Sequence, residues 1–185
     1  MPATIAEATQ ALQQGQVIAY PTEAVFGLGC DPDNEQALKY LLDLKQRPAH
    51  KGLILIAADI AQLSGYILPL TDDQLKHCEA SWPGPVTWLI PKQHGVSRLL
   101  SGEHNTVAVR VTAHPVACEL CNMFGKPIVS TSANLAGQKP ARSIKEIQDQ
   151  FADKIKCIVD GQVDINASPS EIRDLKTNKI LRGSE

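Results

Sequence analysis

The sequence predicts an α/β protein in which helices flank a twisted open sheet that is mixed and largely parallel. Short apolar runs alternate along the chain with stretches of helical apolar spacing, which is typical of layered α/β folds. One run, residues 53–56, is apolar throughout, as expected for a strand that is covered on both faces. A length of 185 residues and a hydrophobic content of 43% fit one ordinary core, so residues 1–185 are predicted to form a single domain.

The helices are predicted from their capping residues and their apolar spacing. Thr4 and Glu7 form a capping-box pattern at the start of a helix that Gly15 ends. Asn34 is a suitable N-cap for a helix with Leu38 and Leu41 on its apolar face. Three further helices are expected over residues 71–80, 115–124 and 143–151.

The strands are predicted from short apolar runs that end at turn residues. Pro21 ends the first run, because proline cannot donate a hydrogen bond within a sheet. The chain shows no internal repeat, low-complexity tract or linker. Strands are expected over residues 17–20, 53–56, 86–90, 106–111, 128–130 and 157–160, with a short edge strand at 180–181.

The distribution of charge limits the class of partner. The formal net charge of -2 argues against a strongly cationic surface that coats nucleic acid. Residues 1–38 contain five acidic side chains and no lysine or arginine, whereas residues 93–185 contain 12 basic and 10 acidic side chains. A site for an anion must therefore take its cations from the middle and the C-terminal half of the chain.

The sequence predicts a cytoplasmic protein that does not enter a membrane. The N-terminus has no positively charged region followed by an apolar run, and the apolar stretch 53–58 is too short to span a bilayer. Five scattered cysteines are typical of reduced thiols. Cys118 and Cys121 form a single CxxC within helical apolar spacing, so they are interpreted as helix residues; a zinc or redox site, with His114 nearby, is the alternative.

Two glycines follow the first predicted strand. Gly27 and Gly29 have the spacing that opens a dinucleotide-binding fingerprint, but Pro32 stands where the third glycine belongs. The glycines are therefore interpreted as turn residues. The phosphate-binding pattern GxxxxGK[ST] does not occur in the sequence.

Cations and hydroxyl groups are placed where a ligand is expected, beyond the ends of strands. Pro48 favours an extended Arg47, so that Lys45 and Arg47 point to the same side and hold one anion. The alternative is a solvated basic helix end. Residues 128–134 run from a strand into serine, threonine and asparagine side chains, which either bind a ligand or form a turn. Arg110 lies within an apolar strand and must pair or contact a ligand.

The sequence lacks a recognisable pattern for a nucleophile. No Ser-His-Asp order, HExxH or paired-carboxylate pattern stands out among the histidines and acids. The residues instead favour phosphate chemistry, in which the protein works by positioning and electrostatic stabilisation.

Taken together, these segments resemble the YrdC family in its short bacterial form. The six matching segments occur in the family's order and cover nearly the whole chain. They are residues 20–29, 45–48, 82–87, 107–111, 127–134 with Gly137, and Pro169 to Ile172 with Leu181 and Arg182.

The resemblance implies a twisted α/β sheet with a concave, positively charged face that holds a nucleotide. It implies a nucleotidyltransferase reaction in which L-threonine, bicarbonate and ATP give threonylcarbamoyl-AMP and pyrophosphate, and Mg²⁺ is expected with the ATP. Partner proteins then transfer the threonylcarbamoyl group to the adenosine beside the anticodon of tRNA.

The resemblance also implies roles for individual residues. Lys45 and Arg47 match a pair that grips the ATP phosphates and are the expected catalytic residues, and Ser132 and Asn134 match a pair at the nucleotide. Thr22 and Arg110 match positions near threonine, and Ser170 and Arg182 match later positions of the same pocket, assigned to ATP. Glu171 departs from the family, where many relatives have threonine, and adds a negative charge near Ser170.

Three other functions are compatible with parts of this pattern. One is a ribosome maturation factor that binds tRNA or double-stranded RNA weakly and has no catalysis of its own. The second is a carbamoyl adenylate former of the hydrogenase-maturation type, which normally carries additional domains. The third is a relative that has lost activity, against which the intact residues Lys45, Arg47, Ser132 and Asn134 argue.

Overall fold

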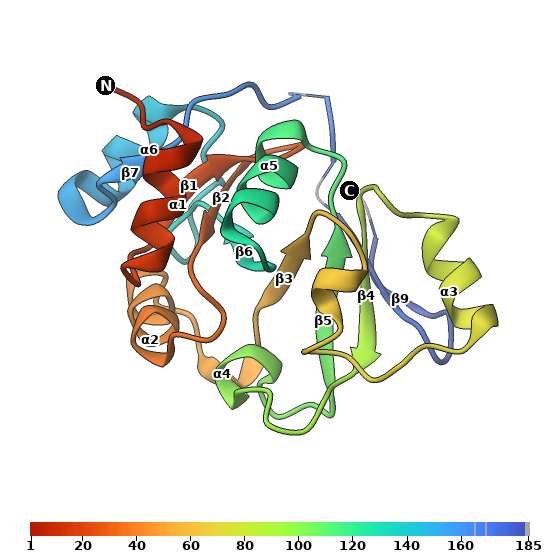
Figure 1. Ribbon diagram of the computed structural model, residues 1–185. Helices are drawn as coiled ribbons and strands as arrows, with labels where there is room; N and C mark the ends of the chain where they lie inside the picture. Colours follow the sequence, from red (N-terminus) through yellow and green to blue (C-terminus); the bar gives the residue numbers. More distant parts are fainter. Residues whose placement is uncertain (165, 169, 184–185) are drawn as a thin grey trace.

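Nine strands of the described residues form one mixed sheet, in the order β7–β1–β2–β6–β3–β5–β4–β8–β9 (Figure 1). The computed structural model describes residues 1–164, 166–168 and 170–183, so Pro169 of the last matching segment lies outside the described residues. The strands are β1 (Ile18–Pro21), β2 (Phe26–Gly29), β3 (Ile54–Ala57), β4 (Val86–Pro91), β5 (Thr106–Val111), β6 (Ile128–Ser132), β7 (Cys157–Ile158), β8 (Glu171–Asp174) and β9 (Ile180–Arg182).

The predicted fold class, an open mixed α/β sheet with flanking helices, is confirmed. Strand pairs β1/β7, β3/β5 and β4/β8 are parallel, and the other five pairs are antiparallel. The sheet is thus less parallel than the sequence suggested, because β2 and β6 insert antiparallel strands between β1 and β3.

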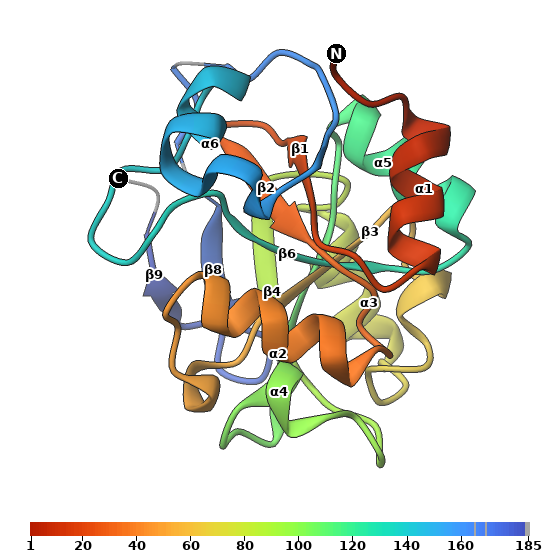
Figure 2. The same ribbon diagram turned by 90° about the vertical axis from the view of Figure 1, so that its left-hand side faces the viewer.

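The helices lie on both sides of the sheet. Figure 1 shows α1 at one end of the molecule and α3 at the other, and in Figure 2 helices α2 and α6 lie on the side that faces the viewer. The helices are α1 (Ile5–Gln13), α2 (Glu35–Leu44), α3 (Asp72–Glu79), α4 (Arg98–Ser101), α5 (Pro115–Phe124) and α6 (Ile144–Phe151), with short 3-10 turns at Ala49–Lys51, Ala61–Leu63 and Ala152–Lys154. None of the helices in the described part of the chain has the length and apolar character needed to span a bilayer.

The predicted helix starts are confirmed by their caps. The side chain of Thr4 accepts a hydrogen bond from the backbone N–H of Glu7, whose carboxylate accepts one from the N–H of Thr4 in return. Asn34 caps α2 by accepting from the N–H of Ala37. The caps satisfy N–H groups that have no partner within the helix, so they fix where α1 and α2 begin.

The sequence did not predict strands β2 and β8 or the short helix α4. Strand β2 consists of the two glycines and two apolar residues, and β8 carries polar residues at three of its four positions, so neither shows the alternation of a half-buried strand. Gly29 is required by close packing, since a Cβ atom there would lie 2.6 Å from the carbonyl oxygen of Val129 and 2.8 Å from the ring of Tyr20. The interpretation of the glycines as turn residues is therefore wrong, although rejecting a dinucleotide fingerprint is consistent with the antiparallel β1–β2 pair.

The buried side chains form two clusters. The larger one joins the leucines of α2 to the central strands and to Trp88 on β4. The smaller one packs α1 and α5 against Ile18, Tyr20, Ile56 and Ile128. Cys121 belongs to this second cluster and its thiol contacts the carbonyl oxygen of Ile56, which agrees with its interpretation as a helix residue.

The register of the central strands determines which side chains face the cavity described below. Ile54 lies opposite both Ala108 and Ser130, so these three side chains share one face of the sheet. Val109 and Val129 point to the other face and belong to the larger core cluster. Successive side chains alternate along a strand, so the core packing of its neighbours places Arg110 on the first face.

Replacing Leu41, which is fully buried in the larger cluster, tests this packing. We expect Leu41→Ala to lower the free energy of unfolding by about 2–5 kcal/mol, because the substitution removes apolar contacts and leaves a cavity. Leu68→Ala is the matched control, since Leu68 is 40% exposed. Chemical denaturation followed by circular dichroism measures both, and equal losses of stability would contradict the assignment of Leu41 to the core.

Candidate active site

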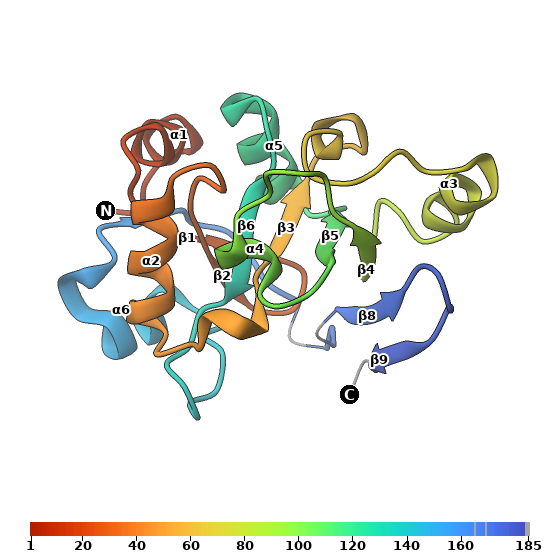
Figure 3. The same cartoon turned by 90° about the horizontal axis from the view of Figure 1, so that it is seen from below.

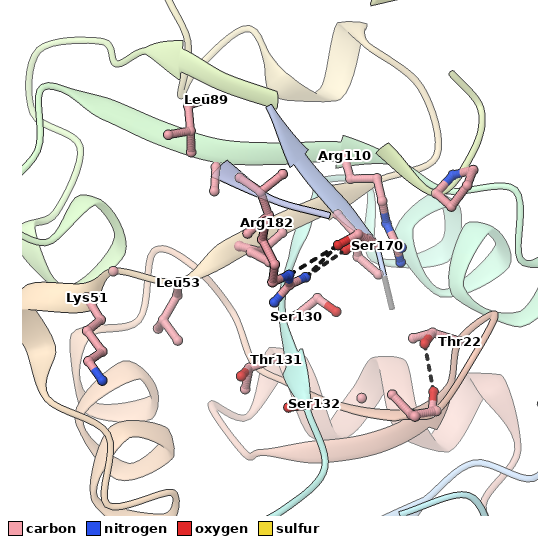
Figure 4. A pocket seen from close by; sticks show the side chains of 18 of the residues that line it. Thr22, Lys51, Leu53, Leu89, Arg110, Ser130, Thr131, Ser132, Ser170 and Arg182 are labelled. Carbon is pink, nitrogen blue, oxygen red and sulfur yellow. Dashed lines mark hydrogen bonds between the residues drawn. The ribbon is translucent and has the colours of Figure 1, made fainter. Parts of the chain in front are cut away.

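A cavity of about 530 Å³ opens over the face of the sheet that carries Ala108, Arg110 and Ser130 (Figure 4). Its walls come from β2, β3, β5 and β6, from the segment that follows α2, and from β8 and β9, which Figure 3 shows beside β4. Six of the eight predicted site residues line it: Thr22, Arg47, Arg110, Ser132, Ser170 and Arg182. Segments that are far apart in the sequence thus meet at one site.

The lining residues carry an excess of positive charge. Four of them, Arg47, Lys51, Arg110 and Arg182, are cations, and a single carboxylate, Glu23, stands against them within the described lining. The whole chain has a formal net charge of -2, so this concentration is local. Such a cavity attracts a compact anion carrying several charges.

Arg110 pairs with Glu23 in the wall of the cavity. Its Nη2 donates to Oε2 of Glu23 at 3.1 Å, and the hydroxyl of Thr112 donates to Oε1 of the same carboxylate at 3.0 Å. Arg110 is only 6% exposed, and its Nε is buried without a hydrogen-bond partner among the described residues. Arg110 therefore pairs with an acid, and one of its donors is buried without a partner among the described residues.

Arg182 and Ser170 bring the C-terminal hairpin to the middle of the cavity, as the dashed lines in Figure 4 show. Nη2 of Arg182 donates to the carbonyl oxygen of Ser170 at 2.7 Å and to its hydroxyl at 3.2 Å. The hydroxyl of Thr87 contacts that of Ser170 at 3.3 Å. Desolvation and then the charge of Arg110 lower the pKa of Arg182. The two cations therefore lie close enough to repel each other.

Arg47 is held at the cavity by a backbone carbonyl. Its Nε donates to the carbonyl oxygen of Gly52 at 3.1 Å. Burial and the charge of Arg182 lower the pKa of Arg47. Both Arg47 and Arg110 are therefore close enough to Arg182 for their positive charges to repel it. The partner of Arg47 is a neutral carbonyl, which leaves its charge available to an anion.

Lys45 does not lie beside Arg47 in the expected way. The prediction that an extended chain turns Lys45 and Arg47 to the same side is wrong, because Lys45 is the C-cap of α2 and Gln46 between them has a φ of 50°. Lys45 is 6% exposed and lies behind the cavity wall. Its Nζ donates to the carbonyl oxygens of Ser132 and Asn134, the second at 2.8 Å. The basic helix end is therefore not a solvated one.

Ser132 and Asn134 form a loop organised around that ammonium group. The Ser132 hydroxyl donates to Oδ1 of Asn134 at 2.6 Å, and Lys45 reaches the same oxygen at 3.3 Å. The Asn134 amide donates to the carbonyl oxygens of Leu135 and Gln138. Ser132 lines the cavity, whereas Asn134 is not among its lining residues. Burial and then the charge of Arg47 lower the pKa of Lys45 to about 8.

Two further expectations concern Thr22 and Glu171. Thr22 lies at the same end of the cavity as Arg110 in Figure 4, but its hydroxyl donates to the carbonyl oxygen of Val25 at 2.7 Å. Glu171 does not line the cavity and pairs with Arg173 at 2.8 Å. The negative charge that departs from the family pattern is thus directed away from Ser170, its neighbour on the strand.

Sequence reasoning missed Glu23, Lys51 and His104 as lining residues. A signal for Glu23 was present, since it follows Thr22 directly in the first matching segment. Lys51 lies four residues after Arg47 in the same basic segment, and Figure 4 shows it at the end of the cavity opposite Thr22. No local pattern marks His104.

The sequence has close relatives among bacterial proteins. A family model of the Sua5/YciO/YrdC group, described as "Telomere recombination", matches residues 10–184. A protein of Aliivibrio fischeri named threonylcarbamoyl-AMP synthase is 55% identical over 178 residues, which cover 95% of this chain and 96% of the relative. A protein of Serratia proteamaculans with the same name is 58% identical over 174 residues, covering 93% and 92%.

Solved structures show the same fold. Sua5 of P. abyssi, crystallised with L-threonine, superposes with a TM-score of 0.87 at 34% identity; the match covers 93% of this chain and 51% of that one, so this chain spans about half of its length. YciO of E. coli superposes with a TM-score of 0.86 at 26% identity, covering 97% and 88%. By its sequence, its fold and the cavity at the predicted positions, the chain belongs to the Sua5/YciO/YrdC family.

Proposed function

We propose that this protein is a threonylcarbamoyl-AMP synthase. The observation that carries the proposal is an identity of 50–58%, over more than nine-tenths of both chains, to bacterial proteins of that name. The cavity supports it independently, because it gathers cations and hydroxyl groups around the space that a nucleotide and a small amino acid need.

The lining residues divide the cavity between two substrates. Lys51 lies at one end in Figure 4, and Arg47 donates to Gly52 directly after it, so both suit the phosphates of ATP. Ser132 suits the rest of the nucleotide, and Lys45 supports it by donating to the carbonyl oxygens of Ser132 and Asn134. At the other end lie Thr22 and Arg110, which suit L-threonine, the ligand named for the relative from P. abyssi. Ser170 and Arg182 lie between the two groups and suit the phosphate nearest the threonine.

The proposed reaction needs positioning and charge neutralisation more than a protein base. The amino group of threonine combines with bicarbonate and loses water to give a carbamate. A carbamate oxygen then attacks the α-phosphorus of ATP, the bond to the β-phosphate breaks, and pyrophosphate leaves with threonylcarbamoyl-AMP as the other product. Two anions meet in this step, so the cations of the cavity lower the barrier by offsetting their repulsion.

Mg²⁺ is proposed as part of the ATP substrate. Within the described residues no group of three His, Cys, Asp or Glu side chains is placed to hold a metal ion. Glu23, the carboxylate that lines the cavity, already faces Arg110. The lining residues thus do not form a magnesium site of their own, and no step is assigned to a protein-bound metal.

The product would be passed to partner proteins that transfer the threonylcarbamoyl group to tRNA. The alternative, a non-catalytic RNA-binding factor, is less well supported, because the positive charge is confined to one cavity of a chain with a net charge of -2. Weak tRNA binding is proposed as an addition to the synthase activity, and its dependence on salt would report how many phosphates are contacted.

Pyrophosphate release by the purified protein tests the proposed function. We expect release from ATP that requires both L-threonine and bicarbonate, because the carbamate of threonine is the nucleophile. Mass spectrometry of the same mixture should detect threonylcarbamoyl-AMP. Release that is independent of threonine, or none at all, would rule out the synthase.

The role of Arg47 is tested by replacement. We expect Arg47→Ala to lower kcat/KM for ATP about 100-fold, since it removes a preorganised charge from the phosphates. Arg98→Ala is the matched control, because Arg98 is exposed and does not line the cavity. Circular dichroism verifies the fold of both variants. Equal activity of the two variants would show that Arg47 does not contact the phosphates.

The lowered pKa of Lys45, about 8, predicts how ATP binding varies with pH. Anion binding favours the charged ammonium group, and the share of charged Lys45 falls as the pH rises through 8. We therefore expect the affinity for ATP to fall by up to tenfold per pH unit above pH 8, measured as a Kd by calorimetry. Lys45→Gln should lack this decrease; the same slope in the variant would assign the decrease to another group.

A further inference from the structure

We infer that Glu23 binds the α-ammonium group of the amino-acid substrate, beside the carboxylate site at Arg110. The inference rests on the proposed function, because it takes L-threonine as the ligand. Glu23 lies in the β1–β2 loop, and its carboxylate would attract the positively charged amino group. This end of the cavity would therefore be selective for an α-amino acid.

The first observation is the unusual setting of Glu23. It is the single carboxylate among the described lining residues of a cavity with four cations. When a threonine zwitterion enters such a cavity, the cations attract its carboxylate and repel its ammonium group. A carboxylate at the threonine end offsets that loss, and without one the cations would disfavour an amino acid against a simple hydroxy acid.

The second observation is that both groups of the pair retain capacity for a ligand. Each oxygen of Glu23 accepts one hydrogen bond, Oε1 from Thr112 and Oε2 from Arg110, and a carboxylate oxygen can accept two. The side chain of Glu23 is 23% exposed and lines the cavity. Arg110, whose Nη2 donates to Glu23, lines the cavity as well. Adjacent donors and acceptors of opposite charge match the two charged groups of an amino acid.

The third observation is that the loop holds Glu23 in place. The N–H of Asp164 donates to the carbonyl oxygen of Glu23 at 2.8 Å. Thr22 closes the same turn, because its N–H and its hydroxyl both reach the carbonyl oxygen of Val25, at 3.0 and 2.7 Å. The carboxylate is thus fixed before the ligand arrives, which reduces the entropy lost on binding.

The test compares two ligands in two proteins. (R)-3-Hydroxybutyrate keeps the carboxylate and the hydroxyl of L-threonine but lacks the amino group. We expect Glu23→Gln to weaken the binding of L-threonine by about 10–100-fold and that of hydroxybutyrate by less than twofold. Calorimetry gives both Kd values, and kinetics gives the KM of threonine and the inhibition constant of hydroxybutyrate.

The comparison separates a binding role from a structural one. Any displacement of Arg110 in the variant affects the carboxylates of both ligands equally, so parallel losses would show that Glu23 only positions Arg110 and would overturn the inference. Unchanged binding of threonine would overturn it as well. Glu119→Gln, on the exposed side of α5, is the control and should leave all constants unchanged.

The failure of the inference differs from failure of the proposed function. A wild-type protein without threonine-dependent pyrophosphate release would refute the synthase, and direct calorimetry would still measure the preference of the site for an amino group. A wild-type protein that releases pyrophosphate, with a Glu23→Gln variant that keeps the preference for threonine over hydroxybutyrate, would refute only the role of Glu23.

Discussion

Mutual repulsion among the guanidinium groups of the cavity is the constraint on which the arrangement of the site depends. Arg47, Arg110 and Arg182 come from the segment after α2, from β5 and from β9. The pKa values of Arg47 and Arg182 are lowered both by desolvation and by a neighbouring cation. Like charges lie this close together only where other interactions in the fold offset their repulsion. The larger apolar cluster holds α2 and β5 in place, and β9 is held by its pairing with β8, which pairs with β4.

The partners of these cations explain why the cavity stays charged. Arg47 and Arg182 donate to backbone carbonyl oxygens, and Lys45 does the same behind the wall. Carbonyl groups orient a cation and satisfy its donors without cancelling its charge. Arg110 alone meets a carboxylate among the described lining residues, at the end assigned to the amino acid. The site is therefore strongly positive toward the phosphates and mixed in charge toward the substrate that is itself a zwitterion.

The fold and the site differ in how far the sequence predicts them. Local signals suffice for α1 and α2, where caps and apolar spacing agree, and for β3 and β5, where apolar runs reveal burial. They do not suffice for β2, whose glycines are explained only by the contact with Tyr20 and β6. The resemblance led to six of the lining residues, yet the place of Lys45 depends on a positive φ at Gln46 and on carbonyl groups 87 and 89 positions away, which no local pattern encodes.

The near-neutral total charge and the cationic cavity are compatible because they act over different distances. Elsewhere, acids and cations neutralise each other locally, as where Lys126 bridges Asp31 and Asp33 at 2.6 and 2.7 Å. At physiological salt, exposed charges more than about 8 Å apart are largely screened, so a small polyphosphate inside the cavity responds chiefly to the arginines around it. A nucleic-acid duplex would extend far beyond the cavity and meet exposed acids as well. The same charges that suit a nucleotide therefore do not make this surface a strong general binder of RNA.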